Sequence, residues 1–324
     1  MSTKEQFERL FENKLSTKEA REFLIDLYNR GESADDIASA VEVMREHSIK
    51  LPIDSNLQEK IIDIVGTGGD KSGSFNISTT VSLLLASMGI PVAKHGNRSI
   101  TSKSGSADVL DALGVELNLT PNQQVQMLKD VNFCFIFAIN HHPAMKHIMP
   151  VRKSIDHRTI FNILGPLTNP AGAKKYLMGV FSPNFIEKMA QSLQKVGAKR
   201  AFVVSSRDGM DEISISDITE YAMLDDSNIT TGVLDPKELG FELYPKSEIL
   251  GGDATENAKI LKGIFDGSIG GAKRDIVLLN SAYALLAAGF VDTPQQGINR
   301  AREALESGKA VTHLQKIVEY SKSL

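Results

Sequence analysis

Glycines and small polar residues are concentrated in residues 63–79, directly after a short apolar run at 61–65. Glycines let backbone amides come close to a ligand, and a helix that follows them presents its N-terminal N–H groups to anions. A dinucleotide fingerprint would need glycine in place of Lys71, and a P-loop ending at Lys71-Ser72 would need glycines in place of Val65 and Asp70. The segment therefore favours an anion site of another type. The alternative is a turn that serves only close packing.

Residues 94–108 form a second polar cluster, with the cations Lys94, Arg98 and Lys103 among five hydroxyl side chains. Hydroxyls, backbone amides and a lysine near a helix start suit a second anion, although solvated basic loops are also common. Each cluster follows an expected strand. Because open α/β sheets bind ligands beyond the carboxyl ends of their parallel strands, we expect the two clusters to converge there.

Asp211 and Glu212 are adjacent acids that follow another expected strand. Mg²⁺ is typically held by one or two carboxylates together with phosphate oxygens of a substrate, although acid pairs are also frequent on surfaces. The histidines 141, 142 and 147 could indicate zinc. No cysteine pair and no His-Glu-x-x-His spacing accompanies them, so packing or capping roles are favoured.

The elements that would position these residues alternate between strand and helix. Residues 1–50 have apolar residues at helical spacing, with a helix start at Ser33 and Asp36. The sequence predicts strands at 61–65, 90–93, 131–139, 177–181 and 201–205, and helices at 78–88, 106–113, 121–130, 143–151, 157–163, 184–196, 254–265, 276–289 and 294–307. This pattern predicts an α/β fold with a mostly parallel sheet. We also expect a separate all-α domain, residues 1–60 plus 142–172, which would form a cleft with an α/β domain of 61–141 plus 173–324.

Length and composition fit a globular protein of about two domains, because the chain has 324 residues and 42% hydrophobic residues. The net charge of −4 argues against nucleic acid or an anionic membrane as a partner. The single cysteine, Cys134, excludes an intrachain disulfide, and the charged N-terminus lacks the apolar core of a signal peptide. We expect a cytoplasmic location.

Residues 225–232 resemble the phosphoribosyl pyrophosphate loop of the type I phosphoribosyltransferases, but their spacing favours a surface turn between strands.

Taken in order, five segments resemble the anthranilate phosphoribosyltransferases of tryptophan biosynthesis over essentially the whole chain. They are 66–70 (Gly-Thr-Gly-Gly-Asp), 94–98 (Lys-His-Gly-Asn-Arg), 102–108, 158–170 and 211–212. The resemblance implies a nucleoside phosphorylase/phosphoribosyltransferase-like architecture and a homodimer. It implies transfer of the 5-phosphoribosyl group from phosphoribosyl pyrophosphate (PRPP) to the amine of anthranilate, with release of pyrophosphate and with Mg²⁺ as cofactor. It leaves open whether a glutamine amidotransferase of anthranilate synthase binds as a partner.

Residue roles follow from the same resemblance. It implies that PRPP is bound by Gly66, Gly69, Asp70, Ser74, Asn76, Ile77, Ser78, Thr79, Lys94, His95, Gly96, Asn97, Arg98, Ser99, Ile100, Thr101, Ser102 and Ser106. It places Gly66, Asn97, His142, Arg152 and Pro166 at anthranilate, and Ser78, Asp211 and Glu212 at the metal. The catalytic candidates are Lys94, which would stabilise the leaving pyrophosphate, Arg152, which would fix the carboxylate, and His95, which with His142 is a candidate general base. Loss of the amine proton to solvent is the alternative.

One departure and two alternatives accompany the resemblance. Ile155-Asp156 stands where the family has Leu-Gly, which could alter the turn on the anthranilate side. A pyrimidine nucleoside phosphorylase would share the architecture, but the segments 66–70 and 158–170 favour the transferase. A nucleic-acid-binding relative without activity would be expected to have a basic surface.

Overall fold

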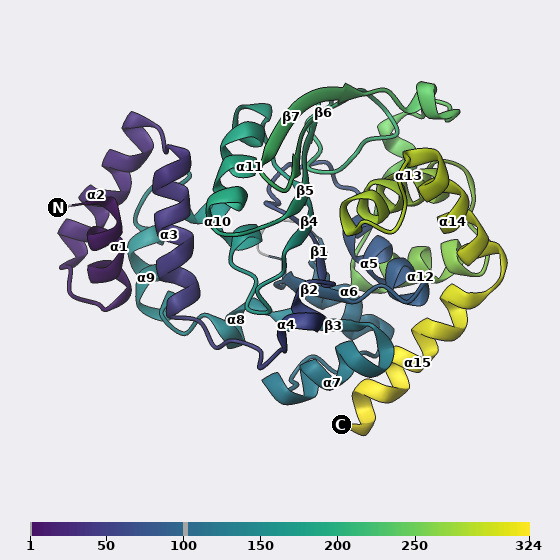
Figure 1. Ribbon diagram of the computed structural model, residues 1–324, viewed down its shortest axis with the longest axis horizontal. Coiled ribbons are helices and arrows are strands. Elements are labelled where there is room, and N and C mark those ends of the chain that lie inside the picture. The colour runs from purple at the N-terminus through teal and green to yellow at the C-terminus, as the bar shows by residue number, and fades with distance from the viewer. Residues whose placement is uncertain (1, 100–102) are drawn as a thin grey trace.

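The computed structural model describes residues 2–99 and 103–324, and within them seven strands form one sheet in the order β3-β2-β1-β4-β5-β6-β7 (Figure 1). The strands are β1 (Ile62–Gly66), β2 (Val92–Gly96), β3 (Phe133–Phe137), β4 (Lys175–Gly179), β5 (Arg200–Ser206), β6 (Thr219–Asp225) and β7 (Asn228–Leu234). Neighbouring strands from β3 to β5 are parallel, whereas β6 and β7 add an antiparallel hairpin at one edge. The expected α/β fold with a mostly parallel sheet is confirmed.

The strand order reverses between β1 and β4. The chain runs from β1 outward to β2 and β3, and then returns to β4 on the other side of β1. Helix α5 (Ile77–Ser87) packs on β1 and β2, and α11 (Ile186–Lys195) packs on β5 and β6. These helices lie on opposite faces of the sheet, with α13 (Gly271–Ala288) beside α5 (Figure 1). Because open sheets bind ligands where the order reverses, the carboxyl ends of β1 and β4 are the expected binding crevice.

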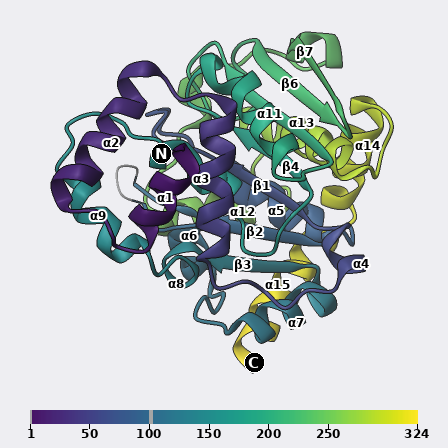
Figure 2. The ribbon, with the colours of Figure 1, turned by 60° about the vertical axis from the view of Figure 1, so that its left-hand side comes forward.

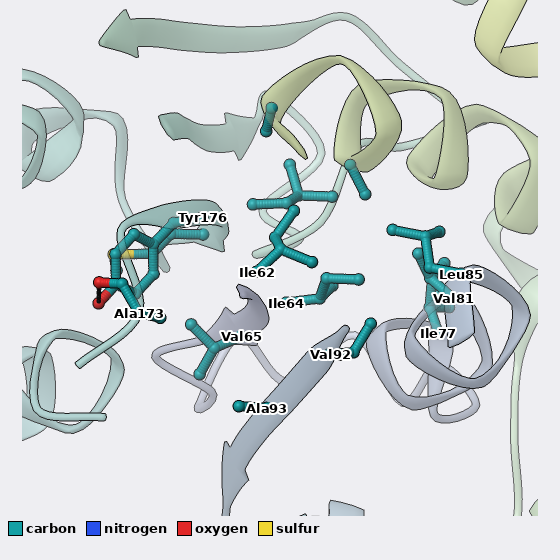
Figure 3. Packing of buried hydrophobic residues seen from close by; sticks show 14 of the residues in the cluster. Ile62, Ile64, Val65, Ile77, Val81, Leu85, Val92, Ala93, Ala173 and Tyr176 are labelled. Carbon is teal, nitrogen blue, oxygen red and sulfur yellow. Dashed lines mark hydrogen bonds between the residues drawn. The ribbon is translucent and has the colours of Figure 1, made fainter. Parts of the chain in front are cut away.

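Side chains of neighbouring strand residues point to opposite faces of the sheet. Figure 3 shows Val92 and Ile64 on the side of α5, whereas Ala93 lies on the other side. The same alternation directs Lys94 toward α5 and His95 toward the opposite face. Two adjacent residues of β2 therefore face opposite sides of the sheet.

Helices α1 (Thr3–Phe11), α2 (Thr17–Arg30) and α3 (Ala34–Glu46) lie to one side of the sheet (Figures 1 and 2). Each begins at a serine whose hydroxyl accepts the N–H three residues on, in a capping box. They pack against α9 (Met145–Lys153) and α10 (Phe161–Leu164). His147 Nε2, for instance, lies 3.1 Å from the carbonyl oxygen of Leu10. The predicted helical character of residues 1–50 is confirmed, with the start at Ser33.

The remaining helices surround this frame. They are α4 (Ser55–Gln58), α6 (Ser106–Leu113), α7 (Pro121–Val131), α8 (Ala138–His141), α12 (Ala254–Phe265), α14 (Pro294–Glu306) and α15 (Lys309–Ser323), with 3₁₀ turns η1 (Gly165–Leu167), η2 (Pro183–Phe185), η3 (Pro236–Leu239) and η4 (Lys246–Ile249). None of the helices in the described ranges combines the length and apolar character needed to span a bilayer.

Several predicted boundaries were wrong. The strand predicted at 131–139 is shorter, because Asn132 ends α7 in the left-handed conformation (φ 53°) and α8 begins at Ala138. The second strand is shifted to Val92–Gly96, α13 starts at Gly271, and α15 was not predicted. The two strands expected around 225–232 were not given bounds, and the structure shows them as the β6–β7 hairpin. Within 225–232 the surface turn is confirmed around Asp226, whereas Asn228 already belongs to β7.

Candidate active site

The glycine-rich loop after β1 folds back over the end of its own strand. Gly68 and Gly69 have φ of 65° and 74°, a region in which glycine avoids the strain that other residues incur. The Gly68 N–H donates to Asp211 Oδ2 over 2.6 Å, and Arg158 Nη2 donates to the Gly69 carbonyl over 3.1 Å. Asp70 Oδ1 accepts the Ser72 N–H over 3.2 Å. The loop thus joins segments that are about 90 and 140 residues apart in the sequence.

Asp211 and Glu212 lie in the turn between β5 and β6, and buried polar side chains fix this turn. Asp208 accepts the Ser214 hydroxyl over 2.8 Å. Asn280, inside α13, accepts the Ile213 N–H over 3.0 Å and donates to the Ile213 carbonyl over 2.8 Å. The turn is therefore clamped on both sides of the acid pair.

Burial raises the pKa of both acids above the usual range, and the neighbouring negative charges raise them further. For Asp211 the second cause is the charge of Asp70, and for Glu212 it is the charge of Asp211. A Cβ atom on Gly66 would lie 2.6 Å from Asp211 Oδ2. Gly66 therefore stands against the acid pair, and its lack of a side chain makes room for the Asp211 carboxylate.

Lys94 is almost completely buried, with 1% of its surface exposed. Its ammonium donates to the Ile64 carbonyl over 2.6 Å and to Ser78 Oγ over 3.2 Å. Burial lowers the pKa of Lys94, while the charges of Asp63, Glu212 and Asp211 raise it. The Lys94 ammonium therefore bonds Ser78 and lies within the electrostatic influence of the three acids.

Helix α5 begins at the end of the glycine-rich loop without a side-chain cap on its first amides. Asn76 is its N-cap residue, and Ser78 and Thr79 lie in its first turn. Uncapped N–H groups at a helix start favour an anion. The hydroxyl of Thr79 is buried without a hydrogen-bond partner among the described residues, and the Ile77 side chain is buried, so both would reach a ligand through their backbone. Ser74 pairs with Leu250 in an isolated β-bridge.

The loop after β2 folds over the start of α6. The Asn97 carbonyl accepts the Ala107 N–H over 3.2 Å, and the Ser99 N–H donates to Asp108 over 2.9 Å. Gly96 packs against Phe135 and Ser106, since a Cβ there would lie 3.0 Å from the ring of Phe135. Ile100, Thr101 and Ser102, also predicted to contact PRPP, lie outside the described residues.

The guanidinium of Arg98 donates to Asp108 over 2.9 Å and to Asp111 over 3.2 Å, both on α6. The contact of Arg98 with PRPP stays a prediction. Arg98 ties its loop to α6.

His95 and His142 form a buried pair on the opposite face of β2 from Lys94. Their Nε2 atoms lie 3.3 Å apart, and His95 Nδ1 lies 3.1 Å from the carbonyl of Gly165, which precedes Pro166. A carbonyl only accepts, so His95 Nδ1 carries its hydrogen and His95 Nε2 accepts from His142. Burial lowers the pKa of both rings, that of His142 to about 4.

Asp63, fully buried on β1, supports this face. It accepts the His95 N–H over 3.2 Å and the Asn169 side-chain amide over 2.7 Å. Burial raises its pKa to about 7. Asp63 thereby connects the segment 158–170 to the strand that carries Lys94 and His95.

The guanidinium of Arg152, on α9, has no hydrogen bond or ion pair to the parts of the chain that the structure describes. Burial lowers its pKa from the usual range. A half-buried guanidinium with unused donors suits a carboxylate, which it can bind with two parallel hydrogen bonds. Arg158, Asn162 and Phe181 line a cavity of about 480 Å³ that Arg152 does not line. The Arg158 guanidinium stacks over the Phe181 ring at 3.6 Å.

The predicted departure at Ile155-Asp156 is accommodated locally. Ile155 packs into the core and its N–H donates to the Arg152 carbonyl over 3.2 Å. Asp156 is exposed and does not have a positive φ, so this turn requires no glycine. Arg152 and Arg158 remain on either side of it.

The histidines and the acid pair differ in how well they suit a metal ion. His141 Nδ1 bonds the Ile49 carbonyl, and His147 bonds the Leu10 carbonyl, which fits the predicted packing role. No group of three or more His, Cys, Asp or Glu side chains within 2–99 and 103–324 is arranged to hold a metal alone. The buried, mutually repelling Asp211 and Glu212 nevertheless fit Mg²⁺, which takes few protein carboxylates and completes its shell with phosphate oxygens and water.

Three polar residues that support the site through hydrogen bonds were not predicted from the sequence. Asn280 interrupts the apolar run 276–291, which was the available signal. Asp63 is a lone acid within the apolar run 61–65. Asn257, which contacts Asn76 over 2.8 Å, lies in the polar first turn of α12 and gave no signal.

This strand switch, with an acid pair opposite a helix start, defines a class of transferases. Residues 58–311 match the family described as "Glycosyl transferase family, a/b domain", and the chain is a member of it. An anthranilate phosphoribosyltransferase of Petrotoga mobilis is 43% identical over 317 residues, covering 98% of this chain and 91% of the relative. The chain therefore belongs to the anthranilate phosphoribosyltransferases, and the expected resemblance is confirmed.

Solved structures agree with this assignment. The crystal structure of anthranilate phosphoribosyltransferase from Thermus thermophilus matches with a TM-score of 0.92 at 38% identity, covering 99% of this chain and 94% of the other. The Saccharomyces cerevisiae enzyme in complex with PRPP and Mg matches with a TM-score of 0.87 at 27% identity, covering 100% and 94%.

Proposed function

We propose that this chain transfers the 5-phosphoribosyl group of PRPP to the amine of anthranilate, giving N-(5-phosphoribosyl)anthranilate and pyrophosphate, the second step of tryptophan biosynthesis from chorismate. The observation that carries this proposal is the buried pair Asp211 and Glu212, placed at the strand switch beside the uncapped start of α5. Relatives of this name cover nearly the whole chain, and one of them binds PRPP and Mg. A nucleoside phosphorylase has no comparable support.

PRPP would lie between the two loops at the carboxyl ends of β1 and β2. Backbone amides of Gly69, Ile77 and Thr79 and the side chains of Asn76 and Ser78 would bind its phosphates. The second wall would be formed by Asp70, Ser74, Lys94, His95, Gly96, Asn97, Ser99 and Ser106. This arrangement places the leaving pyrophosphate near N–H donors, which stabilise the charge that grows as the bond from C1 to oxygen breaks.

Asp211 and Glu212, with Ser78, would hold Mg²⁺. When bound, the ion neutralises charge on the pyrophosphate. The Lys94 ammonium donates to Ser78 Oγ over 3.2 Å, and the charge of Glu212 acts on it to raise its pKa. We propose that Lys94 acts by positioning Ser78 and balancing the acids, in place of the direct contact with pyrophosphate that was expected.

Anthranilate would lie on the face that carries Arg152, His142 and Pro166, with Asn97 and Gly66 at its inner end. Arg152 would bind the carboxylate and hold the amine toward C1 of the ribose, because a weak nucleophile depends on positioning. The new C–N bond forms as the C1–O bond breaks, and the nitrogen then loses one proton. His142, His95 and solvent remain the candidate acceptors of that proton.

The assembly is also a proposal. We propose a division into a helical domain, 1–60 plus 142–172, and an α/β domain, 61–141 plus 173–324, with the cleft between them. We further propose a homodimer in the cytoplasm, without nucleic acid or membrane partners. The buried, unpaired Cys134 is compatible with a reducing compartment. A glutamine amidotransferase is an open candidate as a second partner.

The activity is tested by following anthranilate fluorescence with PRPP and Mg²⁺ each present or omitted. We expect the signal to fall only when both are present. Glu212→Gln should lose most of this turnover, whereas Glu220→Gln, on β6, should keep it. A folded protein that consumes anthranilate without PRPP, or not at all, contradicts the proposal. Normal Mg²⁺ dependence in Glu212→Gln contradicts the metal assignment.

A further inference from the structure

The side-chain amide of Asn76 is held by two segments that lie far from it in the sequence. Its Oδ1 accepts from Asn257 Nδ2 over 2.8 Å and from the Ser104 hydroxyl over 3.1 Å. Its Nδ2 donates to the Ser104 carbonyl over 3.2 Å. An amide nitrogen has two hydrogens, so one N–H of Asn76 has no acceptor among residues 2–99 and 103–324.

The orientation of this amide follows from a short chain of donors. The backbone N–H of Gly252 donates to Asn257 over 2.8 Å, and only an oxygen can accept it. Asn257 therefore directs Oδ1 at Gly252 and Nδ2 at Asn76. Because Nδ2 can only donate, Asn76 must in turn present Oδ1 to it, which leaves the Asn76 nitrogen as the group that a ligand meets.

This orientation matters because the ligand is an anion. An N–H of Asn76 attracts a phosphate oxygen, whereas the amide turned by 180° would present its own oxygen and repel it. Asn257 is 2% exposed and lies on α12, so it does not meet the ligand itself. Its influence on PRPP would pass through Asn76.

The backbone around Asn76 is fixed independently of this contact. The Phe75 N–H donates to the Ile249 carbonyl over 3.2 Å, and the Gly251 N–H donates to the Gly73 carbonyl over 2.9 Å. Ser74 and Leu250 add a β-bridge. Loss of the Asn257 amide should therefore weaken the hold on the Asn76 side chain, which Ser104 would then orient alone, while the loop stays in place.

We propose that Asn257 is a positioning residue for PRPP, which fixes the amide of Asn76 with its nitrogen toward a phosphate oxygen. This inference rests on the proposed function, since it assigns Asn76 to PRPP. It assigns a binding role to a helix about 180 residues away in the sequence.

Asn257→Asp is the decisive variant, because an ionised carboxylate can accept from Gly252 but cannot donate to Asn76. We expect the Kd and KM for PRPP, measured with Mg²⁺ at pH 8, to rise about tenfold or more, with the KM for anthranilate within about twofold. Asn257→Ala, which leaves Ser104 alone to orient the amide of Asn76, should have a smaller effect. A purely structural role predicts the reverse order, because alanine leaves the larger gap.

A double variant with Asn76→Ala separates this mechanism from simple repulsion by the new charge. Without the Asn76 amide, Asn257→Asp should change PRPP affinity little further, so that the two effects are not additive. Gln124→Glu, another buried amide on α7, is the control, and its PRPP affinity should be unchanged.

Additive effects, equal losses for both substrates, or an alanine variant worse than the aspartate variant would each overturn the role of Asn257. If Asn257→Asp does not fold, Asn257→Ala decides, since unchanged PRPP binding in it contradicts the proposal. Wild-type protein that binds no PRPP in calorimetry contradicts both the positioning role and the proposed function. Wild-type protein that binds PRPP without turnover contradicts only the latter.

Discussion

Gly179 lies directly under Asp211, so that a Cβ atom on Gly179 would lie 1.5 Å from the Asp211 carbonyl oxygen. Gly179 ends β4 and pairs in register with Gly66, the last residue of β1, which approaches the Asp211 carboxylate in the same way. Two adjacent strands thus end in glycine because the acid-bearing turn crosses over both. The absence of two side chains sets the position of the acid pair.

Gly179→Ala should therefore displace the turn that carries Asp211 and Glu212. We expect kcat at saturating Mg²⁺ to fall about a hundredfold, since small displacements of groups at a reaction centre have effects of that size. The free energy of unfolding should fall by about 1–3 kcal/mol through overpacking. Gly270→Ala is the control, because open space surrounds that position. Full activity in Gly179→Ala would show that the turn adapts without consequence.

Arg152→Ala should weaken anthranilate binding selectively. Loss of a charge-assisted contact to the carboxylate predicts a KM for anthranilate raised about tenfold to a hundredfold, with the KM for PRPP unchanged. Arg152→Lys should recover part of the loss, since it keeps the charge without the paired donors. Lys153→Ala, the exposed neighbour, controls for long-range charge. An unchanged anthranilate KM in Arg152→Ala would remove this residue from the site.

Acid should destabilise the protein through His142. Its pKa is lowered to about 4 in the folded state, so the unfolded chain binds the proton first, and stability falls as the pH drops from about 6.5 to about 4. A shift of this size corresponds to a stability loss of the order of 3 kcal/mol. The added proton would lie on His142 Nδ1, which is buried without a hydrogen-bond partner among the described residues.

His142→Gln, which keeps a donor for His95 but does not titrate, should flatten the dependence of unfolding free energy on pH in this window. Urea titrations at pH 7, 6 and 5 measure it, with His157→Gln, which stacks on Tyr28, as the control. A slope as steep as that of the wild type would mean that His142 does not contribute to the acid sensitivity.

Asp36 should stabilise the N-terminal helices. Its carboxylate accepts from the Ser33 N–H and hydroxyl and from the Thr3 hydroxyl, and Arg30 donates to both of its oxygens at 2.8 Å. These bonds, above all those from Arg30, lower the pKa of Asp36 far below the usual range. Asp36→Asn should lower the free energy of unfolding by about 2–3 kcal/mol at pH 7, with only a small share from the half-exposed Arg30.

The contribution of Asp36 to the free energy of unfolding depends on pH. Because the folded pKa is depressed, the contribution of Asp36 is complete above the unfolded value near 4 and is lost as the pH falls further. The difference between wild type and Asp36→Asn should therefore shrink at pH 3. Asp35→Asn, which removes an exposed surface pair with Lys195, should cost less than about 1 kcal/mol at any pH. A constant difference for Asp36→Asn would exclude the ionised carboxylate of Asp36 as its cause.

Local sequence signals determined much of this protein. Serine with an acid three residues on specified the starts of α2 and α3, since a capping box needs only neighbouring residues. The apolar run at 61–65 followed by glycines specified β1 and the loop after it. Five short segments between Gly66 and Glu212 indicated the family and the candidate residues.

Tertiary structure decided what distant residues do to one another. Nothing near Lys94 in the sequence shows that its ammonium is enclosed by the Ile64 carbonyl and Ser78, or that Arg98 is occupied by acids of α6. Likewise, Asn257 and Asn280 lie on helices of the last third of the chain and fix loops about 180 and 70 residues earlier. Hydrogen bonds and close approaches depend on distances of a few ångströms, and only the packing of the sheet and its helices sets those distances between such separate segments.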